Sequence, residues 1–143
     1  ATDWIRQCQS HHKGCDNKFI LEPSQNYLPL RLLDLGDHEG ETIGLKFSSQ
    51  LEEMIPQRYI ALSHCWGEAV NLTLTKSSVD NMANFQVKSL TKNFQHAVRI
   101  TRAMKVRYLW IDSLCIVQDD DGEWEAQSAD MGLVYANALC VIC

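Results

Sequence analysis

The sequence predicts an α/β domain with a three-layer core around a parallel sheet, preceded by a hairpin and an irregular segment. From residue 59 onward, apolar runs typical of buried strands alternate with segments of helical periodicity. This order is typical of βαβ units with parallel strands. Before residue 59, two strand-like runs flank a turn rich in glycine and acid, which indicates a hairpin.

Composition narrows the class of protein. The chain has 143 residues, 45% of them hydrophobic and 22% charged, with a formal net charge of −5. A chain of this size can bury one core. Because it is acidic and lacks a basic stripe, we expect no nucleic-acid partner. No apolar run has the length of a membrane span and no signal-peptide pattern opens the chain, so we expect a cytoplasmic protein.

We expect a single domain over residues 1–143, made of an irregular lead-in (1–27), a hairpin and loop (28–58) and an α/β core (59–143). In the lead-in, Cys8, His12 and Cys15 have the spacing of half a zinc site. A structural zinc site needs four ligands, so no metal is expected. The alternative for these three residues is small buried thiols and a turn histidine. The six cysteines suit a reduced, intracellular protein.

The order of the expected elements follows from the periodicity of each segment. Strands are expected at residues 30–35, 42–47 and 59–63, with a loop or one helical turn between 48 and 58. Residues 70–75 could form a strand at the sheet edge, and residues 77–85 a short helix begun by a serine. A clearer helix is expected over residues 90–104, where one apolar stripe faces the core.

The region from residue 107 to 121 is expected to contain the central strand of the core, against which the other elements pack. Residues 108–118 are mostly apolar and predict a buried strand, yet Asp112 interrupts them with a charge. Burying a lone carboxylate is costly, so this acid requires a partner or a role. Asp119 to Asp121 can begin a following helix. A last buried strand is expected at 139–143, and we expect the domain to continue beyond it. The helical stripe expected between them comprises Trp124, Gln127, Ser128, Met131, Val134, Tyr135 and Ala138.

Polar residues follow two of the expected parallel strands. In open parallel sheets, ligands bind beyond the carboxyl ends of the strands. If these two strands are neighbours, their ends form one rim. The alternative is a purely structural role, in which Asp112 accepts hydrogen bonds from His64 or backbone amides and thereby fixes a turn. The first strand end contributes Ser63, His64, Cys65, Trp66 and Gly67, and the second Asp112, Ser113, Cys115, Gln118 and Asp119.

Two further hypotheses concern single side chains. Gln127 lies in an otherwise apolar stripe, so it either braces the rim or faces a pocket; the alternative is that it reaches solvent at the edge of the stripe. A thiol nucleophile could be formed by Cys65 or Cys115 with His64. His64 and Cys65 are sequence neighbours, and neighbours on a strand point to opposite faces, which argues against that pair.

Three motifs resemble the HET domain, the heterokaryon incompatibility domain of filamentous fungi. They are YIALSHCWG (59–67), RYLWIDSLCIVQDD (107–120) and W-x6-M-x3-Y-x2-A (124–138). The resemblance implies a role in non-self recognition, in which the domain triggers programmed cell death when unlike strains fuse. It also implies an effector within or beside a larger sensor protein that carries nucleotide-binding and repeat modules.

HET domains are in turn similar to TIR domains, which implies a flavodoxin-like topology, homo-oligomerisation on activation and cleavage of NAD+ as substrate. In that case Asp112, Gln127 and His64 are the catalytic candidates. The resemblance implies glutamate at position 127, so Gln127 would reduce or abolish activity. The alternative is a non-enzymatic adaptor. The implied ligand-binding residues are Ser63, Trp66, Gly67, Ser113, Cys115, Gln118, Asp119 and Trp124.

Overall fold

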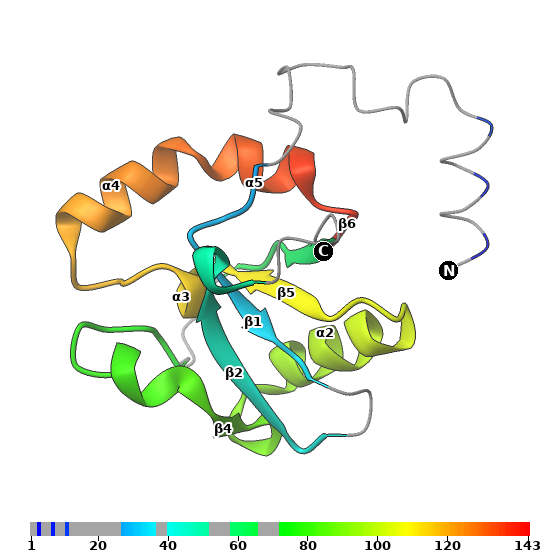
Figure 1. Cartoon of the computed structure of the whole chain (residues 1–143), viewed down its shortest axis with the longest axis horizontal. Helices are drawn as coiled ribbons and strands as arrows, with labels where there is room; N and C mark the ends of the chain where they lie inside the picture. Colours follow the sequence, from blue (N-terminus) through cyan, green and yellow to red (C-terminus); the bar gives the residue numbers. More distant parts are fainter. Residues whose placement is uncertain are drawn as a thin grey trace.

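The protein forms a mixed α/β fold around one six-stranded sheet (Figure 1). The computed structural model describes residues 3, 7, 11, 27–36, 40–51, 58–65 and 72–143. In these residues the strands follow one another across the sheet in the order β4-β2-β1-β5-β3-β6. The strands are β1 (Arg31–Asp34), β2 (Thr42–Phe47), β3 (Tyr59–Leu62), β4 (Phe85–Gln86), β5 (Tyr108–Ile111) and β6 (Cys140–Ile142).

The sheet is parallel on one side and antiparallel on the other. β3 pairs in parallel with both β5 and β6, which confirms the expected βαβ order from residue 59 onward. The predicted hairpin is also confirmed, because β1 and β2 pair antiparallel from Arg31 opposite Phe47 to Asp34 opposite Gly44. The hairpin is not a separate unit, however. β1 also pairs antiparallel with β5, so the hairpin extends the same sheet.

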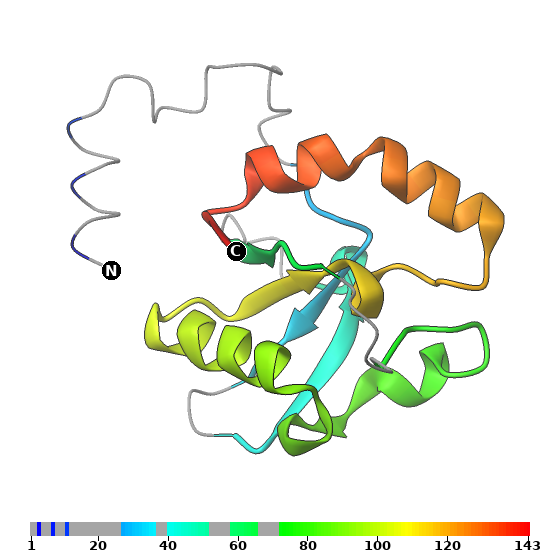
Figure 2. The ribbon, with the colours of Figure 1, turned by 180° about the vertical axis from the view of Figure 1, so that it is seen from behind.

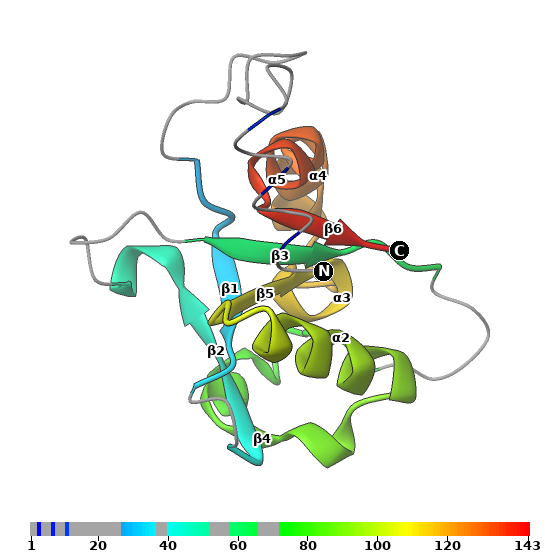
Figure 3. The same cartoon turned by 90° about the vertical axis from the view of Figure 1, so that its right-hand side faces the viewer.

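Helices lie on both sides of this sheet (Figure 3). On one side is α2 (Lys92–Ala103), which confirms the helix expected over residues 90–104. On the other side are α4 (Asp121–Ala129) and α5 (Met131–Asn137), also seen from behind in Figure 2. The face that α2 turns to the core consists of Phe94, Ala97, Val98 and Thr101. The buried Thr101 hydroxyl donates a hydrogen bond to the Ala97 carbonyl oxygen, so its burial leaves no unpaired polar atom.

The expected strand through residue 118 is wrong in its second half. β5 ends at Ile111, and Asp112 begins the one-turn helix α3 (Asp112–Cys115). Asp112 therefore lies at the end of the strand and not within it. Residues 113–117 are buried, but in a helical turn and the segment after it. A short apolar run predicts burial and does not by itself distinguish a strand from a buried turn.

Two other expectations need correction. The single helical stripe from 124 to 138 is divided at Asp130 into α4 and α5, and only Val134 of these two helices is buried. The edge strand expected at 70–75 is absent from its described part, residues 72–75. There the Leu74 amide donates to the Ser113 carbonyl oxygen, and the Gln118 amide donates to the Leu74 carbonyl oxygen. The loop is thus fastened to α3, and Leu74 is fully buried.

Short 3-10 helices complete the described chain. The helix expected over residues 77–85 is the 3-10 helix Val79–Ala83, with Ser78 at its N-cap position. The turn expected after the hairpin is the 3-10 helix Ser48–Gln50. A third, Val87–Ser89, leads from β4 towards α2. No helix in the described part of the chain is both long and apolar enough to cross a membrane.

The carboxylate of Asp34, in the β1–β2 hairpin, is buried and paired with two cations. Arg107 donates two hydrogen bonds to it (2.8 and 3.0 Å), and Lys46 Nζ lies 2.6 Å away. Burial alone would raise the pKa of Asp34, but the hydrogen bonds from Arg107, Lys46 and the Gly36 amide outweigh it and lower the pKa to about 2. Asp34 therefore stays ionised at neutral pH and holds the segment before β5 against the hairpin.

Gly44 provides a test of the packing between β2 and the 3-10 helix Val79–Ala83. A Cβ atom at Gly44 would overlap the Ala83 carbonyl group. Gly44→Ala is therefore expected to lower the free energy of unfolding by about 1–3 kcal/mol or more in urea titrations. The matched control is Gly122→Ala in α4, where the nearest atom would be 3.6 Å away. It should leave the stability unchanged or raise it by up to about 1 kcal/mol. Equal losses in both variants would contradict this packing.

Candidate functional site

The carboxyl ends of β3 and β5 form the candidate site. The two strands are parallel neighbours with Leu62 opposite Ile111, so Ser63 and Asp112 follow at the same edge. This confirms that the two strand ends predicted to share a rim are adjacent. β6 also ends at this edge, beside β3, and the chain end lies next to it (Figure 3). We call the group Ser63, His64, Asp112 and Tyr135 the rim.

Asp112 lies at the centre of the rim. Its Oδ1 accepts a hydrogen bond of 2.6 Å from the Ser113 amide, which starts the α3 turn. The same oxygen is 3.5 Å from His64 Nδ1. The Asp112 side chain is 17% exposed and the His64 side chain 8%. The His64 ring meets the Phe94 ring edge-on, with centroids 5.0 Å apart. His64 is thereby held between α2 and the carboxylate.

Tyr135 completes the rim from the opposite side of the sheet. Its hydroxyl is hydrogen-bonded to the Ser63 side chain, and its ring packs edge-on against Trp110 with centroids 5.6 Å apart. Burial raises the pKa of Tyr135, and the nearby Asp112 carboxylate raises it further. The phenol is therefore protonated at neutral pH and can act as a hydrogen-bond donor. From the sequence, Tyr135 is expected only as part of a helical stripe, and the signal for its place in the rim is a hydroxyl group within that otherwise apolar stripe.

Ser113 and Cys115 do not reach the surface of the rim. Ser113 is fully buried and Cys115 is 1% exposed, within the hydrophobic core. Burial raises the pKa of the Cys115 thiol to about 12, so it is not a thiolate at neutral pH. This argues against the Cys115 nucleophile considered from the sequence. Cys65 is exposed and follows His64 directly.

Gln118 and Asp119 have partners that hold the local backbone. The Gln118 amide group donates to the carbonyl oxygens of Asp112 (3.1 Å) and Ile116 (2.9 Å). The Asp119 carboxylate accepts a hydrogen bond of 2.7 Å from the Lys76 amide. Asp120, as expected for this acidic run, caps α4 by accepting from the Glu123 amide. The ligand-binding role predicted for Gln118 and Asp119 thus competes with contacts that brace the loops behind the rim.

Two of the remaining predicted residues belong to α4, and the others are not described by the structure. Trp124 and Gln127 are both on α4; Trp124 is 51% exposed and Gln127 is partly buried. Trp66 and Gly67 lie outside the described residues, as do Cys8, His12 and Cys15. Among the residues that the structure describes, no group of three or more His, Cys, Asp or Glu side chains could hold a metal ion.

A partly buried ion pair positions the chain behind the rim. Arg31, 5% exposed at the start of β1, donates two hydrogen bonds to the Glu123 carboxylate (2.6 and 2.8 Å) and one to the Cys115 carbonyl oxygen (3.3 Å). Glu123 also accepts from the Val117 amide (2.9 Å). The Arg31 hydrogen bonds lower the pKa of Glu123. This pair is not predictable from the sequence, because its members are 92 residues apart and no motif joins them.

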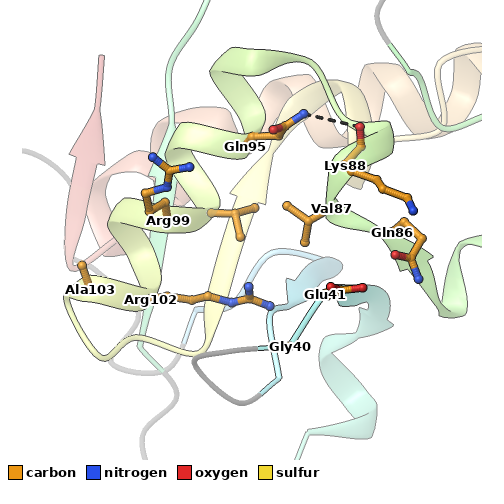
Figure 4. Close-up of a pocket in the computed structure, with 10 residues that line it drawn as sticks. Gly40, Glu41, Gln86, Val87, Lys88, Gln95, Arg99, Arg102 and Ala103 are labelled. Atoms are coloured by element: carbon orange, nitrogen blue, oxygen red, sulfur yellow. Dashed lines mark hydrogen bonds between the residues drawn. The ribbon is translucent and has the colours of Figure 1, made fainter.

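A cavity of about 590 Å³ lies away from the rim, between α2 and the β4 side of the sheet (Figure 4). Gln95, one of its lining residues, donates hydrogen bonds to the carbonyl oxygens of Leu90 (2.7 Å) and Lys88 (3.4 Å). Its lining carries three cationic side chains and one acid, with short apolar side chains between them. The lining residues are Gly40, Glu41, Gln86, Val87, Lys88, Gln95, Val98, Arg99, Arg102 and Ala103.

Fold and rim together define an α/β domain with polar side chains gathered where parallel strands end. The family model of the heterokaryon incompatibility protein (HET) matches residues 59–143. This range contains β3 to β6 and every member of the rim. The chain belongs to the HET family.

One curated relative extends the likeness beyond the matched range. The chain is 34% identical over 138 residues to heterokaryon incompatibility protein 6, OR allele, of Neurospora crassa. That alignment covers 89% of this chain and 20% of the relative, so the chain spans about a fifth of the length of that protein. No solved structure matches the chain.

Thiol titration of the native protein tests the placement of the cysteines. Cys115→Ala is expected to leave the number of rapidly reacting thiols unchanged, because Cys115 is buried and its pKa is raised to about 12. The matched variant Cys65→Ser should remove one rapidly reacting thiol, because Cys65 is exposed. If Cys115→Ala removed a fast thiol while the fold stayed intact, the buried placement would be contradicted.

Proposed function

We propose that this chain is the effector domain of a fungal incompatibility system. It triggers programmed cell death in the cytoplasm when unlike strains fuse, and self-assembly activates it. A sensor protein or module with nucleotide-binding and repeat parts controls that assembly. Membership of the HET family and the likeness to a heterokaryon incompatibility protein support an incompatibility role.

We further propose that the rim is the active site that causes cell death, through TIR-like hydrolysis of NAD+. The observation that carries this proposal is the position of Asp112, partly buried at the carboxyl end of β5 beside His64 and facing Tyr135. Ligands of open α/β sheets bind at this edge. A three-layer relation to TIR domains is part of the proposal. Helices on both sides of parallel β3, β5 and β6 support it, and antiparallel β1 is a departure from it.

The proposed reaction is cleavage of the bond between the nicotinamide nitrogen and the ribose. Positive charge develops on the ribose as the bond breaks, and the Asp112 carboxylate stabilises it. Water adds to the ribose carbon, nicotinamide leaves as a neutral molecule, and His64 accepts the proton released by the water. Tyr135 and Ser63 hold the ribose hydroxyls. Trp66, outside the described residues, stacks on the base.

One observation favours a second candidate, a non-enzymatic adaptor. The Asp112 carboxylate already accepts a hydrogen bond from the Ser113 amide and lies beside His64. This is the arrangement that an acid needs in order to fix a turn. In an adaptor, the rim residues would hold the fold and a protein interface, and no substrate would be consumed.

One variant distinguishes the two candidate functions. If the rim is catalytic, Asp112→Asn lowers nicotinamide release from NAD+ by at least about 100-fold at high protein concentration, measured in the Gln127→Glu form because Gln127 would itself reduce or abolish activity. The matched control is Asp80→Asn, which removes a carboxylate from the exposed part of the 3-10 helix Val79–Ala83 and should leave the rate unchanged. Circular dichroism verifies that both variants are folded.

Killing of fungal cells is measured in parallel. A folded, assembled protein that releases no nicotinamide but still kills would support the adaptor and overturn NAD+ cleavage. A protein that kills no cells when it is folded and assembled would overturn the effector role itself. Equal rates for the Gln127→Glu form with and without Asp112→Asn would place any hydrolysis outside the rim.

A further inference from the structure

The charges of this chain are separated along its sequence. Residues 81–111 contain six Lys and Arg residues and no acid, whereas residues 112–143 contain seven Asp and Glu residues and no Lys or Arg. In the fold, the first segment includes α2 and the second includes α4 and α5, which lie on opposite sides of the sheet (Figure 3). Within residues 81–143, the basic side chains are therefore on the segment that includes α2 and the acidic side chains on the segment that includes α4 and α5.

Two of these basic side chains already have partners within the chain. Arg107 is paired with Asp34, and Arg102 donates to the Leu35 carbonyl oxygen at 2.6 Å. Lys88 and Arg99 are exposed at the cavity between α2 and the β4 side of the sheet. We call this cavity with its two exposed cations the basic cavity.

The basic cavity suits an apolar anchor flanked by acids. Its volume of about 590 Å³ is within the range of cavities that enclose a small ligand, and so it is large enough for one big side chain. Val87, Val98 and Ala103 give it an apolar lining. Glu41 also lines it, but the cations outnumber this acid, as Figure 4 illustrates.

The segment with the acidic side chains presents such an anchor. Trp124 on α4 is 51% exposed, and Asp121, three residues earlier, lies on the same face of the helix. Glu125 is exposed next to it. Other acids of this region have partners within the chain, since Glu123 binds Arg31 and Asp120 lies 3.1 Å from Lys76. We call Asp121, Trp124 and Glu125 the acidic ridge.

We propose that the acidic ridge of one copy docks into the basic cavity of a second copy. Trp124 enters the apolar lining, and Asp121 and Glu125 face Lys88 and Arg99. Exposed tryptophan residues are frequent anchors of protein interfaces, and complementary charge selects the partner and its orientation. This inference rests on the proposed activation by self-assembly and assigns the surfaces that would perform it.

The arrangement has a consequence for the form of the assembly. The ridge and the cavity are different surfaces, so the contact is heterologous and every bound copy keeps one surface unoccupied. Such contacts produce open, head-to-tail chains unless the rotation between copies closes a ring. The rim belongs to neither surface, so it stays available in the assembled state.

Sedimentation at increasing protein concentration tests the two surfaces. The unmodified 143-residue chain is expected to form oligomers at low salt that dissociate as salt is raised, because surface charges are screened. Arg99→Glu and Glu125→Arg should each weaken association at least about 10-fold. The double variant Arg99→Glu, Glu125→Arg should restore most of it. The control Arg58→Glu, an identical change at an exposed residue before β3, should have no effect.

A mixing experiment tests the head-to-tail form. Arg99→Glu retains an intact ridge and Trp124→Ser retains an intact cavity, so an equimolar mixture should form 1:1 dimers and nothing longer. The proposal is overturned if the unmodified chain stays monomeric at all concentrations. It is also overturned if Arg99→Glu and Arg58→Glu assemble equally well, or if the mixture forms long chains.

Cell killing separates the failure of this inference from the failure of the proposed function. If the unmodified chain kills cells while Arg99→Glu assembles and kills as before, these surfaces are wrong and the effector role stands. If the chain assembles as described and loses assembly in both single variants, yet no form kills, the surfaces stand and the effector role is overturned.

Discussion

The chain after β5 depends on one partly buried ion pair, Arg31 with Glu123. An arginine at the start of β1 would be costly to bury alone, and a carboxylate beside the core equally so. Their two hydrogen bonds, with those to the Cys115 carbonyl and from the Val117 amide, give partners to the Glu123 carboxylate and to both terminal nitrogens of Arg31, while the buried Arg31 Nε has none among the described residues. They fasten the end of α3 and the start of α4 to the start of β1. The path of the chain from α3 into α4 follows from this contact.

That path determines what surrounds the rim. Since α3 is held in place, Asp112 stays at the end of β5 beside His64, and α5 follows α4 across the other side of the sheet. Tyr135 then reaches Ser63 and Trp110. The same path separates the charges, because every Lys and Arg between residues 81 and 143 precedes Asp112.

The sequence predicted the parts of the fold that depend on local pattern. The apolar run at 42–47 has the bounds of β2, and the order of strands and helices after residue 59 gave the parallel pairing that makes Ser63 and Asp112 neighbours. It could not predict where β5 ends, because a buried turn and a buried strand are equally apolar. Arg31 with Glu123 and Ser63 with Tyr135 join distant parts of the chain, and no periodicity reports such contacts.

A double-mutant cycle on Arg31 and Glu123 tests the central claim most directly. The free energy of unfolding is measured for Arg31→Met, Glu123→Gln and the double variant. Glu123→Gln leaves the buried Arg31 without its charged partner, and Arg31→Met leaves the partly buried Glu123 carboxylate without its own; each is expected to cost about 1–3 kcal/mol. The double variant should lose clearly less than the sum of the two, because neither unpaired charge remains. Small, additive losses of below about 1 kcal/mol each would show that this pair does not hold the chain behind the rim.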